Sequence, residues 1–291
     1  MSYFICPVCA EKHGAAAPAL NREGAVLRCE KGHSFDISSK GYVNLLLSQH
    51  KNTKDPGDSK EMAAARRLFL SSGAYQPLKD SLCAAAAECC REISAPVIAD
   101  CGCGEGYYTE GLYDALCRGG NTPEIFAVDI SKNVLAAAKP RFRERKIHAA
   151  AASCFRMPLP DECVDLAAVV FAPFCREELL RIVKQGGYVI DVIPAREHLY
   201  ELKELLYEHP YYNEVKPYGV DGLALVGKRE VNYELTITEQ EMLNALFTMT
   251  PYYYKTSPAD SAALYSYFGT HSVFKVRAAF EILIYRKERE R

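Results

Sequence analysis

Apolar residues follow two different periods along most of the chain. From about residue 81 onward, segments with apolar residues at helical spacing are separated by short, continuous apolar runs. Such runs between helices are typical of parallel strands that are covered on both faces. The predicted helices are 78–93, 107–117, 133–143 and 176–184, and the predicted strands are 97–99, 125–128, 147–152, 164–171 and 188–193.

This alternation breaks down toward the end of the chain. Residues 231–237 and 277–285 have the pattern of strands, and residues 239–247 that of a helix between them. Two strands in succession suit an antiparallel edge better than a further parallel unit. The predicted fold is therefore α/β, with a mostly parallel, Rossmann-like sheet that has an antiparallel edge.

The first 80 residues differ in texture from the rest. Residues 1–38 contain metal-ligand spacing and short strand-like pieces, and residues 39–80 form a polar, partly basic connector. The connector contains a predicted helix over 59–70, for which Asp58 or Ser59 is a suitable N-cap. We therefore expect three segments, with residues 81–291 forming the main domain.

Composition and charge narrow the class of protein. A chain of 291 residues can build one well-buried α/β domain with a small appendage. It contains no apolar run of the roughly 18 residues that a membrane helix needs, and its start lacks the features of a signal peptide, so a cytoplasmic protein is expected. Residues 1–80 hold 11 Lys and Arg against 8 Asp and Glu, whereas the remainder holds 24 against 29. This asymmetry favours an anionic partner near the amino-terminal part.

The strongest local signal is a glycine-rich turn between the predicted strand 97–99 and the predicted helix 107–117. Its glycines are Gly102, Gly104 and Gly106. A strand, a glycine turn and a helix N-terminus together let a ligand approach the backbone closely. The dinucleotide pattern G-x-G-x-x-G requires glycine where this chain has Tyr107. Asp100, just before the turn, would repel a pyrophosphate but suits the cationic methionine end of S-adenosylmethionine.

Asp129 is the second part of the predicted cofactor site. It ends the apolar run 125–128, and a carboxylate at the tip of a second strand can accept hydrogen bonds from both ribose hydroxyls. Enzymes that bind NAD use the same device, so Asp129 indicates that the ligand contains a ribose but does not by itself identify a methyl donor. The alternatives are that Asp129 caps the next helix and that the glycine turn holds no ligand.

Four residues near the amino terminus have the spacing of zinc ligands. Cys6 and Cys9 form a C-x2-C pair, and Cys29 and His33 form a C-x3-H pair. Four such ligands close a tetrahedral shell and leave no position for water, which predicts a structural zinc ion. Chance cysteines with a packed histidine are the alternative, and His13 is a spare candidate ligand.

Taken together, these features resemble the bacterial 23S rRNA (guanine-N1)-methyltransferases of the RlmA type, which have a class I methyltransferase domain. The resemblance spans roughly residues 1–210, and the connector is its most specific part. The matching segments include the four zinc-ligand positions and residues 41–46, 55–59, 65–67, 73–78, 103–109, 129–132 and 172–173.

The resemblance implies S-adenosylmethionine and zinc as bound groups, a guanine N1 in a 23S rRNA hairpin as the target, and a possible homodimer. It further implies cofactor contacts from Tyr75, Gly104, Glu105 and His198. Without the family, Tyr75 would be an ordinary packed aromatic residue and His198 a polar residue at the start of a helix.

Candidate substrate contacts fall into a cationic and an aromatic group. A target guanine must be unpaired or extruded to be methylated at N1. Phe171 and Phe174, at the end of the predicted strand 164–171, could stack on the base or simply pack in the core. The cationic candidates for phosphate contacts, which could equally form a solvated surface, are Lys51, Lys54, Arg66 and Arg67.

Two other functions share parts of this pattern. A small-molecule methyltransferase with a structural zinc module would have the same turn but would not need a basic connector. A non-catalytic RNA-binding protein could keep a degenerate turn, although Asp100, Gly102, Gly104 and Asp129 are all present.

Overall fold

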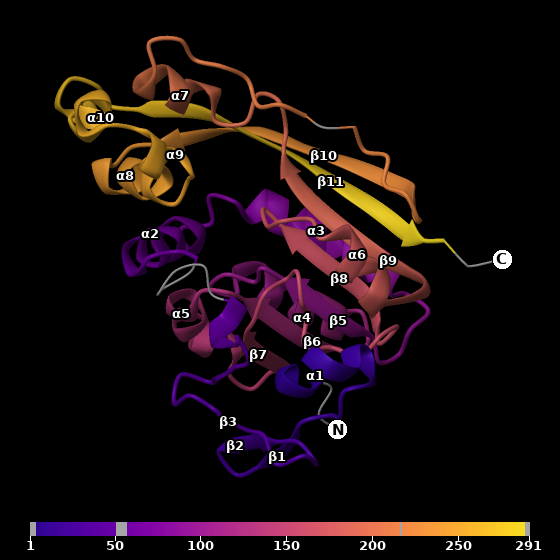
Figure 1. Cartoon of the computed structure of the whole chain (residues 1–291). Coiled ribbons are helices and arrows are strands. Elements are labelled where there is room, and N and C mark those ends of the chain that lie inside the picture. The colour runs from indigo at the N-terminus through magenta and orange to yellow at the C-terminus, as the bar shows by residue number, and fades with distance from the viewer. Residues whose placement is uncertain (1–3, 51–56, 216, 289–291) are drawn as a thin grey trace.

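The computed structural model describes residues 4–50, 57–215 and 217–288. Within this part of the chain, eight strands form one sheet in the order β10-β11-β9-β8-β5-β6-β7-β4 (Figure 1). These strands are β4 (Tyr42–Asn44), β5 (Val97–Cys101), β6 (Glu124–Asp129), β7 (Ile147–Ala151), β8 (Val164–Val170), β9 (Val183–Pro194), β10 (Leu223–Ile237) and β11 (Phe274–Lys287).

The sheet is parallel from β4 to β9 and antiparallel at the other edge. β11 runs against both of its neighbours, β9 and β10, and its pairing with β10 extends over almost the whole of both strands. The predicted mostly parallel sheet with an antiparallel edge is confirmed. The chain order reverses between β5 and β8, and open α/β sheets bind ligands beyond the carboxyl ends of the strands at such a point, which is called the crevice below.

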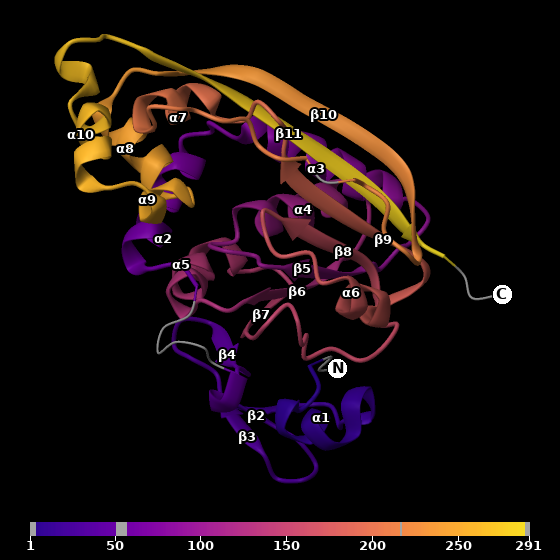
Figure 2. The same ribbon diagram turned by 45° about the horizontal axis from the view of Figure 1, so that its top comes forward.

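Helices cover both faces of the sheet, as Figure 2 shows. One face packs against α3 and α4 through apolar side chains such as Leu82 and Leu112, and the other packs against α6 through Leu179 and Ile182. Burial on both faces explains why β5, β6 and β8 each contain a continuous apolar run rather than an alternating pattern. The helices next to the sheet are α3 (Gln76–Cys89), α4 (Tyr107–Arg118), α5 (Lys132–Phe142) and α6 (Arg176–Ile182).

Several predicted boundaries were wrong: the strand expected over 231–237 begins at Leu223, and the helix expected over 78–93 ends at Cys89. The boundary before β9 is the most informative. The helix expected over 176–184 ends at Ile182, and β9 begins at Val183 and continues through Gly186 and Gly187. A side chain at position 187 would place its Cβ 3.0 Å from the carbonyl oxygens of Asp165 and Lys184. The glycine therefore permits a close approach of two backbones inside the sheet, and it does not mark a loop.

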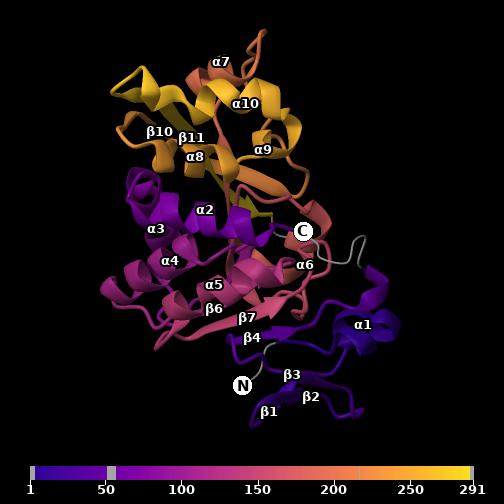
Figure 3. The same cartoon turned by 90° about the vertical axis from the view of Figure 1, so that its left-hand side faces the viewer.

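The amino-terminal residues form a small module that docks on the sheet (Figure 3). Phe4 packs edge-on against Phe126 of β6 with ring centroids 5.2 Å apart, and the Ile5 amide donates to the Pro158 carbonyl. Its elements are α1 (Pro7–His13), η1 (Gly14–Ala16) and a three-stranded antiparallel sheet of β1 (Asn21–Glu23), β2 (Val26–Arg28) and β3 (Ser34–Asp36). The next strand, β4, was not predicted and lies parallel to β7.

A group of helices gathers at one end of the long strands β10 and β11 (Figure 1). The connector helix α2 (Lys60–Ser71) contacts α8 of this group and α5 beside the sheet. The short 3-10 segments are η2 (Ser48–His50) and η3 (Tyr267–Gly269). The helices of the group are α7 (Tyr200–Leu206), α8 (Gln240–Thr248), α9 (Tyr252–Lys255) and α10 (Pro258–Tyr265).

Replacing the cap of α2 tests its contribution to stability. Ser59 is the N-cap, and its hydroxyl accepts a hydrogen bond from the Met62 amide. We expect Ser59→Ala to lower the free energy of unfolding by about 1 kcal/mol, because the first turn loses an acceptor. Ser59→Asp should stay close to the parent protein, since a carboxylate caps equally well. Urea denaturation measures both variants, and equal losses in the two would contradict the capping role.

Candidate active site and metal centre

The four predicted zinc ligands lie together in the amino-terminal module. The Nδ1 atom of His33 lies 3.5 Å from the Sγ of Cys6, 3.3 Å from that of Cys9 and 3.4 Å from that of Cys29. A tetrahedral zinc ion with ordinary bond lengths would hold nitrogen and sulfur about 3.5 Å apart. All four ligand atoms lie within 4.8 Å of one another. The donor set and its spacing therefore fit zinc, and the imidazole comes from His33 rather than from His13.

Local structure explains how the two ligand pairs are presented. Cys6 is the N-cap of α1, and Cys9 lies in the first turn of that helix, where Pro7 is tolerated because its missing N–H would have no partner. The second pair lies on a tight turn in which the Cys29 amide donates to the His33 carbonyl. Gly32 has φ of 85° in this turn, a conformation that favours glycine.

The glycine turn follows β5 as predicted and leads directly into α4. Gly102, Gly104 and Gly106 all have positive φ angles. A Cβ on Gly102 would lie 2.5 Å from the Cβ of Ala172, the second residue after β8. The turn and the end of β8 thus meet at the crevice where the strand order reverses.

Two carboxylates tie this turn to its neighbours. Asp129 ends β6, and its two oxygens accept hydrogen bonds from the Gly104 amide at 2.9 Å and the Ser131 amide at 2.8 Å. Asp100 is almost completely buried and accepts a hydrogen bond from the Thr109 hydroxyl at 2.6 Å. This bond links β5 to the first turn of α4. Both predicted residues therefore shape the turn, one from each side.

Burial makes these carboxylates unusually weak acids. It raises the pKa of Asp100 from 3.8 to about 7, although the hydrogen bond from Thr109 opposes the shift. Burial also raises the pKa of Asp129, while the amides of Ser131 and Gly104 oppose that rise. Asp100 can consequently change its ionisation near neutral pH.

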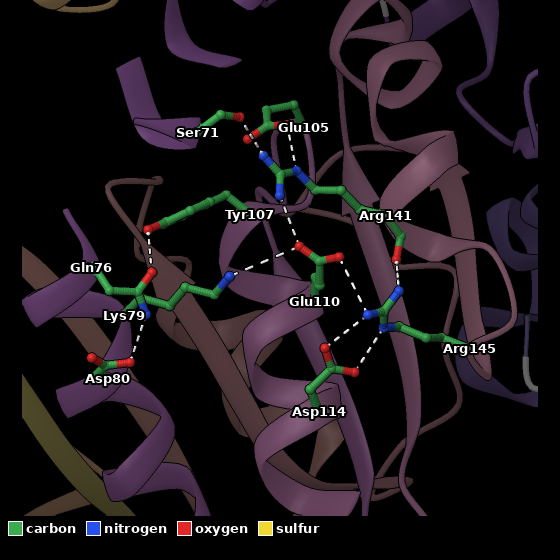
Figure 4. Close-up of polar contacts among 10 residues, drawn as sticks. All are labelled: Ser71, Gln76, Lys79, Asp80, Glu105, Tyr107, Glu110, Asp114, Arg141 and Arg145. Atoms are coloured by element: carbon green, nitrogen blue, oxygen red, sulfur yellow. Dashed lines mark hydrogen bonds and ion pairs between the residues drawn. The ribbon is translucent and has the colours of Figure 1, made fainter. Parts of the chain in front are cut away.

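An arginine on α5 binds Glu105 in the glycine turn (Figure 4). Arg141 donates to Glu105 at 2.8 Å, to Glu110 on α4 at 2.8 Å and to the Ser71 hydroxyl of α2 at 3.0 Å. The Glu105 side chain is almost fully buried, and burial raises its pKa while the bond to Arg141 lowers it. This network joins the turn, α2, α4 and α5 at one guanidinium group.

Aromatic residues from distant parts of the chain line the crevice beside the turn. The Tyr75 ring lies 4.9 Å from the ring of Phe280 on β11, and His198 lies 4.5 Å from the same phenyl ring. Burial lowers the pKa of His198 to about 3, with a smaller contribution from Lys203, so the imidazole is neutral near pH 7. Tyr75 and His198, both predicted to contact the cofactor, are thus brought into one cluster.

The predicted substrate residues are placed in different settings. Phe171 follows β8 with φ of 53° and its side chain is 46% exposed, whereas Phe174 packs near Tyr285 with ring centroids 6.0 Å apart. Arg66 forms an ion pair with Asp58, and Arg67 donates to the Ala137 carbonyl. Lys51 and Lys54 lie outside the described residues.

Sequence reasoning missed three residues of this site. Thr109 and Arg141 have no motif of their own, and their roles arise from contacts with Asp100 and Glu105. Tyr108 also packs at the crevice, where its ring lies 6.3 Å from that of Phe171. The available signals were its place directly after the glycine turn and the family resemblance over residues 103–109.

Comparison with known proteins agrees with this site. The family description "RlmA, N-terminal", a zinc ribbon, matches residues 4–54, and "Methyltransferase domain" matches residues 99–191. The chain is 34% identical, over 90% of both lengths, to a protein of Micromonospora griseorubida provisionally named a 23S rRNA (guanine-N1)-methyltransferase. It is also 34% identical to the 23S rRNA (guanine(748)-N1)-methyltransferase of Streptomyces fradiae, over 70% of this chain and 68% of that protein.

The chain belongs to the 23S rRNA (guanine-N1)-methyltransferase family. Membership makes it a methyltransferase that uses S-adenosylmethionine and carries a zinc ribbon. Within the described residues, no helix is long and apolar enough to cross a bilayer. A family member from Bacillus subtilis with a similar provisional name is 29% identical over 90% of both chains.

The residues of the crevice fit the family's cofactor. Glycines with positive φ let a ligand lie against the backbone, and the carboxylate of Asp129 stands at the tip of β6. The hydroxyl of Tyr75 is buried and has no hydrogen-bond partner among the described residues, as expected for a group that awaits a ligand.

Removing one sulfur should release the metal. We expect Cys29→Ala to lower the zinc content by about one ion per chain and to unfold the amino-terminal module, because the ribbon is too small to have a core of its own. Mass spectrometry under native conditions measures the metal. Cys117→Ala, which removes an exposed cysteine outside the cluster, is the control and should keep the ion. An unchanged zinc content in Cys29→Ala would contradict the assignment.

Neutralising the buried carboxylate of Asp100 should stabilise the protein in a pH-dependent way. Its pKa is higher in the folded than in the unfolded chain, so its contribution to stability is complete below pH 3.8 and is lost as the pH rises to about 7. Asp100→Asn avoids this loss and can still accept from Thr109. We expect the variant to exceed the parent by roughly 2–4 kcal/mol at pH 8 and by much less near pH 4. A constant difference across this range, measured by thermal unfolding, would exclude the ionisation of Asp100 as the cause.

Proposed function

We propose that this protein transfers the methyl group of S-adenosylmethionine to N1 of a guanine in a hairpin of 23S rRNA. The observation that carries the proposal is the presence of a zinc ribbon and a methyl-donor turn in one chain. That chain also matches a relative of this name over 90% of both lengths. The relative from Streptomyces fradiae, named for guanine N1 of 23S rRNA, supports the choice of atom and substrate.

The geometry at the glycine turn supports the proposed cofactor residues. Gly104 leaves room for the cofactor against the backbone, since the nearest atom to a Cβ there would be 3.9 Å away, and Asp129 retains lone pairs for the ribose hydroxyls beside its two backbone bonds. Tyr75 and His198 both pack against Phe280 of β11. The cofactor, when bound, supplies a methyl group on a sulfonium. The proposed cofactor-binding residues are Tyr75, Asp100, Gly102, Gly104, Glu105, Gly106, Asp129 and His198.

Catalysis by this chain is chiefly positioning. In methyl transfer from a sulfonium, the carbon–sulfur bond breaks as the nitrogen–carbon bond forms in line, so the target nitrogen must lie opposite the leaving sulfur. The proton on guanine N1 must also pass to water or another base. Phe171 stands at the carboxyl end of β8 with an exposed ring, directly beside the crevice. We assign it the stacking of the extruded guanine, a contact that is strong and tolerant of geometry. Phe174 is the weaker candidate because its ring packs beside Tyr285.

The amino-terminal part supplies the remaining RNA contacts in this proposal. Residues 1–38 act as a zinc ribbon that holds RNA, residues 39–80 as the basic connector, and residues 81–291 as the methyltransferase domain. Arg67, Lys51 and Lys54 are the proposed phosphate contacts, and the Arg66 ion pair with Asp58 makes Arg66 a weaker candidate for that role. The family resemblance favours a homodimer, and ribosomal RNA as substrate favours action in the cytoplasm.

A labelling experiment tests the activity. Incubation of the protein with methyl-labelled cofactor and unmodified 23S rRNA should place the label on N1 of one guanine. Phe171→Ala should raise the KM for RNA about tenfold or more, because base stacking is worth 1–3 kcal/mol, with cofactor affinity unchanged.

Other outcomes separate the alternatives. Label on a small molecule, with turnover that does not depend on salt, would favour a small-molecule methyltransferase. RNA binding without affinity for the cofactor would favour a non-catalytic RNA-binding protein.

A further inference from the structure

Two buried tyrosine hydroxyls at the crevice lack hydrogen-bond partners. The side chains of Tyr75 and Tyr108 are 3% and 8% exposed, and neither hydroxyl has a partner among the described residues. A buried hydroxyl that loses its bonds to water costs about 1–3 kcal/mol unless something replaces them. The two groups are therefore poised to donate to a ligand that enters this crevice.

Tyr108 lies where the fold places ligands. It is the second residue of α4, and its ring packs edge-on between the rings of Tyr107, at 5.0 Å, and Phe171, at 6.3 Å. The first of these residues follows the glycine turn of β5, and the second follows β8. Tyr108 thus spans the point of strand-order reversal, where open α/β sheets bind their ligands.

The surroundings of the Tyr108 hydroxyl favour an anion. Burial raises the pKa of Tyr108 well above its usual value, with Tyr75 adding to the rise and Arg66 opposing it, so the hydroxyl stays protonated and donates. The Nη1 atom of Arg66 lies 3.9 Å from the position that a Cβ on Gly104 would take. Two hydroxyl donors and the N-terminus of a 12-residue helix favour negative charge, and the guanidinium of Arg66, which already pairs with Asp58, lies nearby.

The cofactor has one such group. In S-adenosylmethionine only the carboxylate of the methionine end is anionic, and guanine is neutral near pH 7. An RNA phosphate is a poor candidate, because the two hydroxyls are almost completely buried and the Arg66 side chain on α2 is only 28% exposed. Arg66, first expected to contact phosphate, therefore fits the cofactor better.

We propose that the Tyr108 hydroxyl donates a hydrogen bond to the methionine carboxylate of the cofactor, in a seat that it shares with Tyr75 and Arg66. This inference rests on the proposed function, and Tyr108 is not among the cofactor-binding residues named there. The ribose and the methionine carboxylate are at opposite ends of the cofactor, and the sulfonium lies between them. Holding both ends therefore sets the direction in which the methyl group points.

Calorimetry with two ligands tests the contact. S-adenosylhomocysteine has the carboxylate, and 5′-methylthioadenosine lacks the whole amino-acid end. We expect Tyr108→Phe to weaken S-adenosylhomocysteine about tenfold to a hundredfold, the value of a hydrogen bond to a charged group, and to leave 5′-methylthioadenosine unchanged. Its thermal stability should equal or exceed that of the parent, because the lost hydroxyl had no partner in the free protein.

The neighbouring tyrosine provides a matched control. The Tyr107 hydroxyl donates to Gln76 at 3.2 Å, so Tyr107→Phe should lower stability slightly and leave S-adenosylhomocysteine binding within twofold. An affinity of Tyr108→Phe within twofold of the parent would overturn the proposal, with a bound water then satisfying the hydroxyl. Equal losses for both ligands, or a higher KM for RNA with unchanged S-adenosylhomocysteine affinity, would also overturn it. Failure of the parent protein to bind either ligand would instead reject the proposed function.

Discussion

The structure depends on the anchoring of one glycine turn. The amides of Gly102 and Cys103 donate to the carbonyl of Val128, and the Gly104 amide donates to the carboxylate of Asp129. The end of β5 and the end of β6 are therefore one hydrogen-bonded unit, and the two features that a nucleoside cofactor needs cannot move independently. Arg141 on α5 also stabilises the turn, because its guanidinium donates to Glu105 in the turn and to Glu110 in the first turn of α4.

The amino-terminal module is joined to this frame by backbone pairing as well as by side chains. β4 extends the sheet beyond β7, and the Leu45 amide continues the contact by donating to Ala151. The connector helix α2 then crosses to α8 at the far end of the molecule. The zinc ligands are consequently held in a defined orientation to the crevice.

The wall of the crevice shows how distant segments cooperate. Tyr75 precedes α3, His198 precedes α7 and Phe280 lies in β11, yet their rings are in contact. The antiparallel edge makes this possible, since β11 pairs with β9 and places Phe280 opposite Pro194, the last residue of β9. An edge that looks like an addition to the parallel sheet therefore completes the ligand site.

Short-range patterns determined much of this protein. The alternation of apolar runs and helical spacing predicted the sheet and most of its helices, because burial on both faces demands it, and the four zinc ligands were evident from their spacing. Tertiary structure alone decided which polar atoms remain without partners. The roles of Arg141, Thr109 and Tyr108 could not be assigned from local sequence, since each takes its role from residues that are distant or across a turn. Gly187 shows the same limit, because only the neighbouring strand reveals that it lies in a sheet.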